Sequence, residues 1–295
     1  MSKKEEIMRK KKVCGLLILL VIYVLAFFVG LLCFKLLEDK MHVIYNLLIC
    51  DCVATVFVWI VGIFLKSASV YDPYWSVQTV VIYLCLQIYY NNFNFGNVLF
   101  FIVLMIWAVR LTYNFAHGFN DISYIDWRYK QIKEKTGVFY QFVSLLGIHM
   151  VPTLIVFIAS VPAFMYVINN NSFDILNIIG LVIMLIGILL ELISDINMIQ
   201  FKKIRKDRNE IINIGLWKYS RHPNYLGEIT FWYGVALVFI LNNLNMWYLV
   251  VGAILNTLLF LFISIPLAEN NLKKYKLNYS EYQKKTRMLF PFKKV

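Results

Sequence analysis

Polar side chains concentrate in one short stretch of a chain that is otherwise largely apolar. Within the stretch SRHPNYLGE, residues 220–228, the eight positions from 221 to 228 hold five side chains that carry charge or hydrogen-bond: Arg221, His222, Asn224, Tyr225 and Glu228. Pro223 suits the first turn of a helix, because its missing amide hydrogen would be unpaired there and its φ is already helical. A helix that starts at Pro223 places Asn224, Tyr225 and Glu228 on one face.

A helix start beside cationic side chains favours anions, because free backbone amides and the positive end of the dipole point the same way. Arg221 and His222 stand at this start. The preceding loop adds four cations: Lys202, Lys203, Arg205 and Arg208. Two interpretations are open, a site for a polyanion such as a phosphate-bearing cofactor and a surface that meets lipid headgroups.

Acidic residues inside the apolar runs form a second group. An ionisable side chain at membrane depth costs at least about 2.5 kcal/mol, so each one invites a functional hypothesis. Glu191 and Asp195 are four residues apart and share a helical stripe with Lys202, and Asp51 lies in the middle of another run. The stripe predicts either a ligand site or an interhelical salt-bridge patch near the membrane surface.

The front half of the chain carries a third group, within SVYDPYWS (69–76) and the segment 110–129. Tyr74 is of a type common in the aromatic belts at membrane surfaces. Asp72 and Arg110 have no such simple explanation. We therefore expect the substrate end of a site to use Asp72, Tyr74, Arg110 and Tyr113.

The elements that position these residues are membrane helices. Of the 295 residues, 60% are hydrophobic and the mean hydropathy is +0.67. A helix needs about 20 apolar residues to cross a hydrocarbon core of about 30 Å. Seven or eight runs are close to this length: 13–37, 42–66, 76–91, 97–117, 138–168, 174–200, 226–241 and 245–268. The sequence predicts an all-α, polytopic membrane bundle of seven to eight transmembrane helices, in which 138–168, with its two prolines, is one kinked helix or a broken pair.

The net charge of +12 follows a pattern that sets orientation. Lys and Arg gather in the N-terminal tail and in later segments that all fall on one side if there are eight spans: 127–135, 201–208, 218–221 and 273–294. The positive-inside rule then places both termini in the cytoplasm of a multi-pass protein. We expect the lipid bilayer and a lipophilic small molecule as partners, with no nucleic acid and no obligate protein partner. The five cysteines lie inside predicted spans, without a disulfide framework or a metal-binding spacing.

Five stretches in order carry a family resemblance: YDPYWS, RLTYNF with DWRY after it, ELISDINMIQFK, GLWKYSRHPNYLGEITFWYG, and the closing AENNLKKYKLNYSEYQKKTRMLFPF. Together they resemble the steroid 5α-reductase C-terminal-domain family, particularly its largely uncharacterised prokaryotic-type branch. The resemblance covers 70–295, as a catalytic membrane domain, and leaves 1–69 as a tail with the first two transmembrane helices. The RHPNY core alone is also similar to isoprenylcysteine carboxyl methyltransferases, which bind S-adenosylmethionine.

The resemblance implies NADPH bound from the cytoplasmic side without a Rossmann domain, and no GxGxxG follows a predicted strand. It assigns the nicotinamide-ribose end to Asp195 and Asn224, the phosphates to Lys202, Arg205 and Arg221, and the floor of the site to Glu228. Its remaining cofactor residues are Glu191, His222, Tyr225 and, closing the cytoplasmic mouth, Tyr275, Tyr279 and Tyr282 with Arg287.

The sequence departs from the family pattern at the residue expected to donate a proton. The family pattern implies a proton-donating tyrosine one turn before Arg110, where this chain has Trp107. An indole N–H donates a hydrogen bond but cannot act as an acid, so the donor is expected at Tyr113, Tyr74 or Asp72. The leading hypothesis is an NADPH-dependent reductase that adds hydride to a C=C bond conjugated to a carbonyl in a lipophilic substrate. The alternatives are an S-adenosylmethionine-dependent methyltransferase and a non-catalytic lipid-binding protein.

Overall fold

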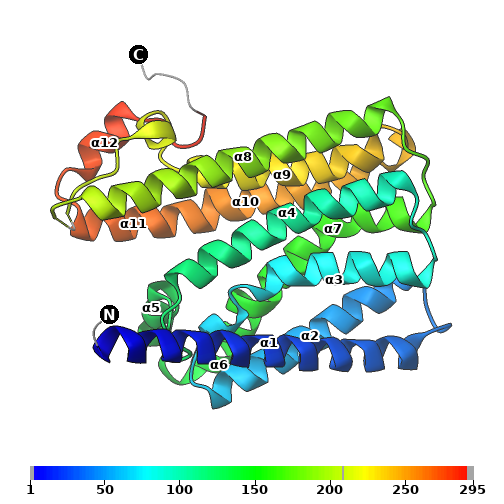
Figure 1. Cartoon of the computed structure of the whole chain (residues 1–295), viewed down its shortest axis with the longest axis horizontal. Helices are drawn as coiled ribbons and strands as arrows, with labels where there is room; N and C mark the ends of the chain where they lie inside the picture. Colours follow the sequence, from blue (N-terminus) through cyan, green and yellow to red (C-terminus); the bar gives the residue numbers. More distant parts are fainter. Residues whose placement is uncertain (1–2, 208, 291–295) are drawn as a thin grey trace. The chain divides into compact units, whose positions relative to one another are not determined.

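The computed structural model describes residues 3–207 and 209–290, and within these ranges the chain is helical with no strand (Figure 1). The expected all-α class is confirmed. The chain divides into two compact units, one of residues 1–92 with 107–158 and one of residues 93–106 with 159–295. Two helices run through both units, α4 (Phe95–Gly118) and α7 (Val151–Ile168).

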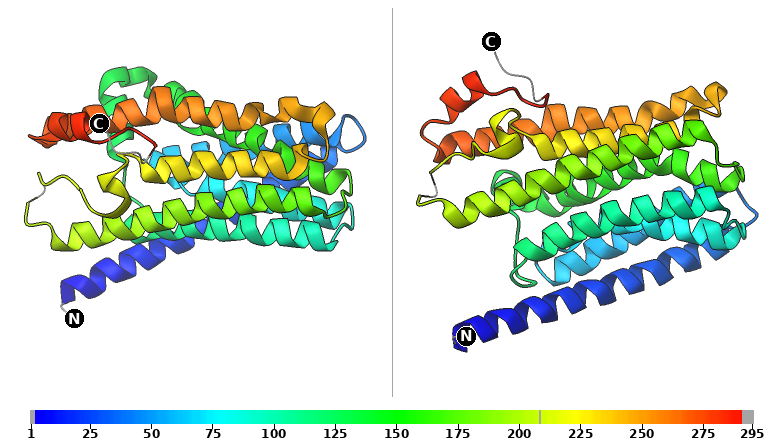
Figure 2. Two further views of the ribbon diagram at one scale, coloured as in Figure 1. Left: turned by 90° about the horizontal axis from the view of Figure 1, so that it is seen from above. Right: turned by 45° about the horizontal axis from the view of Figure 1, so that its top comes forward.

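The first unit is built around the pair α1 (Lys3–Leu37) and α2 (Val43–Phe64), which lie side by side in both Figure 1 and Figure 2. Its other helices are α3 (Tyr74–Tyr89), α5 (Trp127–Thr136) and α6 (Tyr140–Val143). Two hydroxyl contacts fasten α2 and the turn before α3 to the start of α7: the Oγ1 atoms of Thr55 and Thr153 are 3.0 Å apart, and the Tyr71 hydroxyl is 2.7 Å from that of Thr153. Polar links of this kind replace the hydrophobic driving force that helices lack in lipid.

The segment with two prolines is a continuous helical run. Between α6 and α7 lies a π-helical stretch, Ser144–Met150, so neither a sharp break nor a loop separates the two parts. Within this stretch the Ser144 carbonyl lies 2.9 Å from Nδ1 of His149. Of the two possibilities for 138–168, a single run with a local irregularity is the observed one.

The second unit is dominated by α8 (Ile175–Ile204) and α9 (Pro223–Ile240), which lie side by side in every view. Its remaining helices are α10 (Val251–Leu259), α11 (Ile265–Tyr275) and α12 (Tyr279–Lys285), with a π-helical stretch, Phe260–Ser264, between α10 and α11. The carboxylate of Asp174 accepts from the amides of Leu176 and Asn177 and so caps the start of α8.

Glycines bring α8 and α9 to backbone contact. Gly180 and Gly187 on α8 face Gly227 and Gly234 on α9, with the same spacing of seven residues on each helix. A Cβ on Gly187 would stand 2.6 Å from the Phe231 nitrogen, and a Cβ on Gly234 would stand 2.6 Å from a backbone nitrogen of α8. Small residues at a membrane helix interface permit this approach, and here they bring Glu191 of α8 against Gly227 of α9.

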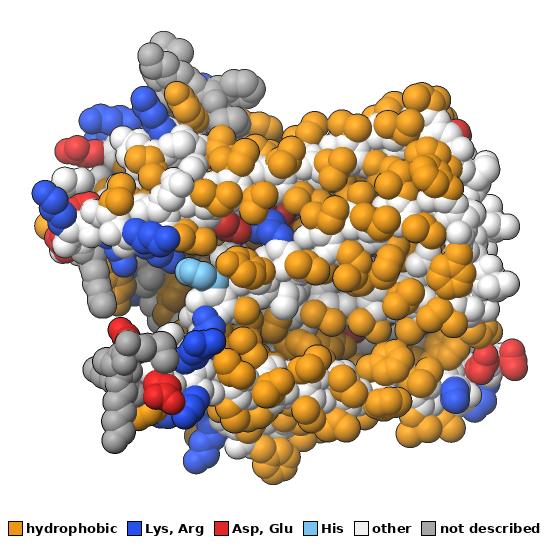
Figure 3. All heavy atoms as spheres, in the orientation of Figure 1, with side chains coloured by type: hydrophobic (Ala, Val, Ile, Leu, Met, Phe, Trp, Pro, Cys, Tyr) orange, Lys and Arg blue, Asp and Glu red, His pale blue; other side chains and the backbone are white. Residues whose placement is uncertain are grey.

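Six helical runs are long and apolar enough to cross a membrane among the residues described, fewer than the seven to eight spans expected. The expected spans 76–91 and 226–241 correspond to α3, with 16 residues, and α9, with 18. At 1.5 Å per residue, α3 is about 24 Å long and shorter than a hydrocarbon core. On the face drawn in Figure 3, hydrophobic side chains cover the middle of the helices and Lys and Arg side chains gather near their ends. These features are those of a multi-pass membrane protein.

Candidate functional site

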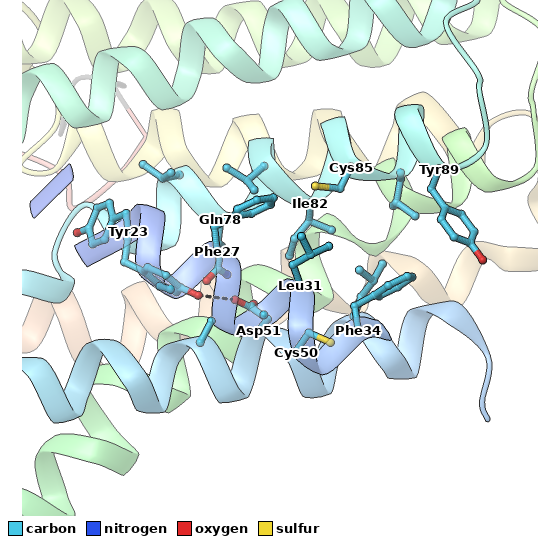
Figure 4. Close-up of a pocket in the computed structure, with 18 of the residues that line it drawn as sticks. Tyr23, Phe27, Leu31, Phe34, Cys50, Asp51, Gln78, Ile82, Cys85 and Tyr89 are labelled. Atoms are coloured by element: carbon cyan, nitrogen blue, oxygen red, sulfur yellow. Dashed lines mark hydrogen bonds between the residues drawn. The ribbon is translucent and has the colours of Figure 1, made fainter. Parts of the chain in front are cut away.

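The first unit contains a cavity of about 390 Å³ between α1, α2 and α3 (Figure 4). Its walls are mainly apolar side chains such as Phe27, Leu31 and Ile82. At the far end of α3 the rings of Phe34 and Tyr89 meet edge to face, with centroids 5.6 Å apart. A volume of this size suits a lipophilic small molecule.

Polar side chains interrupt the apolar wall, among them Asp51 from α2, and Tyr74 and Gln78 from α3. The Tyr74 hydroxyl donates to Oδ1 of Asp51 at 3.1 Å, the contact dashed in Figure 4. Asp51 is 4% exposed and Gln78 is 5% exposed. Oδ2 of Asp51 and both amide atoms of Gln78 are buried without a hydrogen-bond partner among the described residues. Burying such atoms unpaired costs about 1–3 kcal/mol each, so three of them in one cavity mark the place of a polar ligand group.

Asp72 precedes the cavity residue Tyr74 by two positions but has a different environment. Its Oδ1 accepts from the Tyr129 hydroxyl at 2.5 Å, which ties the turn before α3 to α5. Burial raises the pKa of Asp72 to about 7, although the hydrogen bond from Tyr129 opposes the rise. Asp72 is not among the cavity-lining residues. Its contacts are those of a group that positions the start of α3, where Tyr74 follows.

In the second unit, the stretch that precedes α9 is joined to the C-terminal segment. The amides of Arg221 and His222 donate to the carbonyls of Arg287 and Met288 at 2.9 and 3.1 Å, in a parallel bridge. The Arg221 side chain donates through Nε to Glu269 at 2.7 Å and through Nη1 to the carbonyls of Gln283 and Thr286. Two of its guanidinium nitrogens are thus used to hold α11, α12 and the following segment together.

Glu269, on α11, is the acceptor at the centre of this cluster. Its Oε1 lies 3.1 Å from Nε2 of His222, and its Oε2 accepts from Nε2 of Gln283 at 2.5 Å. The His222 ring stacks on that of Tyr225 with 3° between the planes, and Tyr225 in turn meets Phe260 with centroids 4.7 Å apart. His222 is the N-cap residue of α9, which starts at Pro223 as the sequence predicts.

Two acids are buried where α8 and α9 touch. Glu191 is 2% exposed, and its Cγ would be 2.5 Å from a Cβ on Gly227. Glu228 is 4% exposed and accepts from Nε1 of Trp232 at 2.8 Å. Oδ1 of Asn224 is buried without a hydrogen-bond partner among the described residues. The Asn224 amide is therefore a group of this stretch whose hydrogen-bonding capacity is not used within the described residues.

The remaining predicted cofactor residues separate into buried and exposed ones. Tyr279 is buried, and the half-buried Tyr282 donates to the Trp217 carbonyl at 2.5 Å. Burial raises the pKa of Tyr282, and the charge of Arg221 partly offsets the rise. On α8, Asp195 is half-buried, Lys202 is exposed, and Arg205 is the half-buried C-cap residue. Tyr275 is 63% exposed and makes no part of the cluster around Glu269.

A protein-family model described as "Protein of unknown function (DUF1295)" matches residues 58–286, which is most of the chain. The chain belongs to the DUF1295 family. This is a steroid 5α-reductase-like membrane family. An uncharacterized protein of Schizosaccharomyces pombe is 24% identical, over 59% of this chain and 58% of its own length. The chain thus spans less than two thirds of that relative, and no solved structure matches it.

The range matched by the DUF1295 model includes only part of the residues that line the cavity. Tyr74 and Gln78 lie within the matched residues, whereas Asp51 precedes them. Sequence reasoning selected Tyr74 and noted Asp51 as a charge inside a span, but it missed Gln78. The available signal was the spacing of four residues between Tyr74 and Gln78, which places both on one face of α3.

The other front residues of this DUF1295 chain do not join Tyr74 at the cavity. Tyr113 is 67% exposed, with its ring against His117. Arg110 is half-buried on α4, with Nε and Nη2 buried, and does not line the cavity. Trp107 is fully buried against Trp75, with centroids 5.9 Å apart. Of the four substrate-end residues expected from the sequence, the structure brings only Tyr74 to the cavity.

Proposed function

We propose that this DUF1295 protein, of the prokaryotic-type branch, is an NADPH-dependent reductase. It reduces a C=C bond conjugated to a carbonyl in a lipophilic substrate and works inside a membrane, with both termini in the cytoplasm. The observation that carries the proposal is the Tyr74–Asp51 pair, 3.1 Å apart, in the wall of an otherwise apolar cavity. The family relationship to steroid 5α-reductase supports the same reaction class.

The pair fits the charge that this reaction develops. When bound, NADPH supplies a hydride to the β-carbon of the enone. The electrons of the double bond move toward the carbonyl oxygen, and a hydrogen-bond donor placed in a dry site stabilises the charge there. Tyr74 is the donor that we propose for this oxygen. In the structure the single O–H of Tyr74 donates to Asp51, so it has to turn from Asp51 to the substrate oxygen when the substrate binds. A proton then reaches the α-carbon, with Tyr74 as the proposed acid, and one from water restores the Tyr74 hydroxyl.

The second unit supplies side chains that fit a dinucleotide. The Asn224 amide has an unpartnered buried oxygen that suits a carboxamide or ribose hydroxyl donor. Lys202 and Arg205 end α8 as cations suited to phosphates. Because Arg221 already donates to Glu269 and two carbonyls, its proposed role in the site is to hold the C-terminal segment in place. Glu191 and Glu228, buried beside Gly227, form the proposed floor.

The cofactor is tested by titrating purified protein in detergent with NADPH while following tryptophan emission. We expect quenching in the intact protein and weaker binding in Asn224→Ala, with Asn213→Ala as an exposed control in the neighbouring loop. Parallel calorimetry with S-adenosylmethionine examines the methyltransferase alternative. Binding of S-adenosylmethionine with no response to NADPH would overturn the reductase proposal.

The reaction is tested by following NADPH oxidation with a panel of lipophilic enones. Tyr74→Phe removes the hydroxyl and keeps the ring, and the loss of one donor to a developing oxyanion costs on the order of 10²–10³ in kcat. Tyr113→Phe makes the same change on an exposed side chain, and we expect it to retain activity. Equal rates for the two variants would exclude Tyr74 as the donor, and binding of NADPH without turnover of any enone would favour a non-catalytic lipid-binding protein.

A further inference from the structure

Gln78 is a buried amide that the proposed reaction does not use. Its side chain is 5% exposed, and both Nε2 and Oε1 lack a hydrogen-bond partner among the described residues. It lines the apolar cavity of the first unit, as do Phe27 and Ile82, which are labelled with it in Figure 4. An amide in such surroundings is costly unless both its donor and its acceptor find partners. A ligand bound in the cavity would supply the hydrogen-bond partners that the Gln78 amide lacks.

The place of Gln78 along α3 determines where that partner would lie. It follows Tyr74 by four residues, which is about one helical turn or roughly 6 Å along the axis. Beyond it, the α3 wall is formed by apolar or weakly polar side chains up to Tyr89. A ligand whose carbonyl meets Tyr74 would therefore pass Gln78 before its apolar remainder reaches the rings of Phe34 and Tyr89.

The chemistry of the free atoms restricts the ligand group. Nε2 needs an acceptor and Oε1 needs a donor, and one hydroxyl can satisfy both because it has an O–H and two lone pairs. A ketone or ether would leave Oε1 unpaired. We propose that Gln78 is a specificity-determining residue that binds a hydroxyl of a lipophilic ligand, about one helical turn from the carbonyl that meets Tyr74. The identity of the carbonyl group rests on the proposed function; the hydroxyl is inferred from Gln78 itself.

The test measures binding without cofactor, using the full chain in detergent. The probes are β-ionone, a lipophilic enone, and its 3-hydroxy and 4-hydroxy derivatives, which carry the hydroxyl at two distances from the carbonyl. Calorimetry gives Kd for each in the intact protein, in Gln78→Leu and in the control Gln87→Leu. Gln87 is a buried amide on the same helix that does not line the cavity. Because partition into detergent is the same for all three proteins, the ratio of Kd values is compared between them.

We expect at least one hydroxylated ionone to bind the intact protein more tightly than β-ionone. The ratio should fall by about tenfold or more in Gln78→Leu, because the ligand hydroxyl is then buried unpaired, and stay unchanged in Gln87→Leu. Equal ratios in the intact protein and Gln78→Leu would overturn the inference. So would a lack of preference in the intact protein, or failure of all three ionones to bind. Gln78→Met repeats the test if Gln78→Leu does not fold.

The two proposals fail in different ways. A protein that prefers the hydroxylated ionone but never oxidises NADPH would refute the reductase and leave the role of Gln78 standing. A protein that reduces enones with no preference for the hydroxyl would refute the role of Gln78 alone.

Discussion

Replacing Gly187 with alanine is a direct test of the contact between α8 and α9. The added Cβ would lie 2.6 Å from the Phe231 nitrogen and 2.7 Å from the Gly227 carbonyl oxygen. Favourable non-bonded contacts lie near 3.5–4.0 Å. Both obstructing atoms belong to the backbone, so no side-chain rotation relieves the clash and the helices must separate by about 1 Å.

The expected cost is the difference between two effects. Overpacking a well-packed interface costs about 1–3 kcal/mol, and the upper end applies where backbone must move. Alanine in place of a helical glycine returns about 1 kcal/mol through helix propensity. The net expectation is a loss of about 2 kcal/mol. At about 2–4 °C per kcal/mol for chains of this size, the apparent Tm should fall by about 4–8 °C.

The assay is thermal unfolding in detergent, followed by tryptophan emission or circular dichroism at a fixed scan rate. Gly147→Ala is the matched control, because a Cβ at Gly147 meets no atom within 4 Å. We expect its Tm to be unchanged or slightly higher. If Gly187→Ala were as stable as Gly147→Ala, the close approach of α8 and α9 would be refuted.

Two further changes test other parts of the chain. Burial raises the pKa of Asp72 in the folded protein to about 7, above the value near 3.9 of an unfolded chain. The stability that Asp72 contributes is therefore complete below pH 4 and is lost as the pH rises through 7. Asp72→Asn should therefore gain Tm relative to the intact protein between pH 5 and 8, and parallel Tm–pH curves would contradict this. Glu269→Gln removes the carboxylate charge that contacts Arg221 and His222. Because breaking a buried pair is destabilising, trypsin should then cut the C-terminal segment several-fold faster. The exposed Glu281→Gln is the control, and equal cleavage rates would contradict the role of Glu269.

Periodicity and composition were sufficient for the parts of the fold that depend on local sequence. The apolar run 174–200 appears as α8, Ile175–Ile204, and the start of α9 at Pro223 is confirmed. The π-helical stretches Ser144–Met150 and Phe260–Ser264 were not predictable in this way. A π turn changes the register by one residue, and the apolar composition on both sides continues through it unchanged.

The cavity and the bridge to the C-terminal segment depend on contacts distant in sequence. Asp51 and Tyr74 are 23 residues apart, and Ser220 pairs with Arg287 across most of the C-terminal third of the chain. No local pattern states that a particular carboxylate will face a particular hydroxyl, because that depends on how the helices pack. Gln78 illustrates the limit: the sequence does not show that the amide of a single glutamine in a helix is buried without a hydrogen-bond partner among the described residues.

The bridge also changes how the polar stretch 220–228 is understood. In the sequence its cations indicated an anion site at a helix start. In the structure Arg221 and His222 meet Glu269, and their backbone amides are taken by the C-terminal segment. A guanidinium neutralised by a carboxylate contributes less to binding a phosphate than a free one would. Within this stretch the charged pair therefore serves chiefly to hold the C-terminal segment against α9, and Asn224 is the group best placed to meet a ligand.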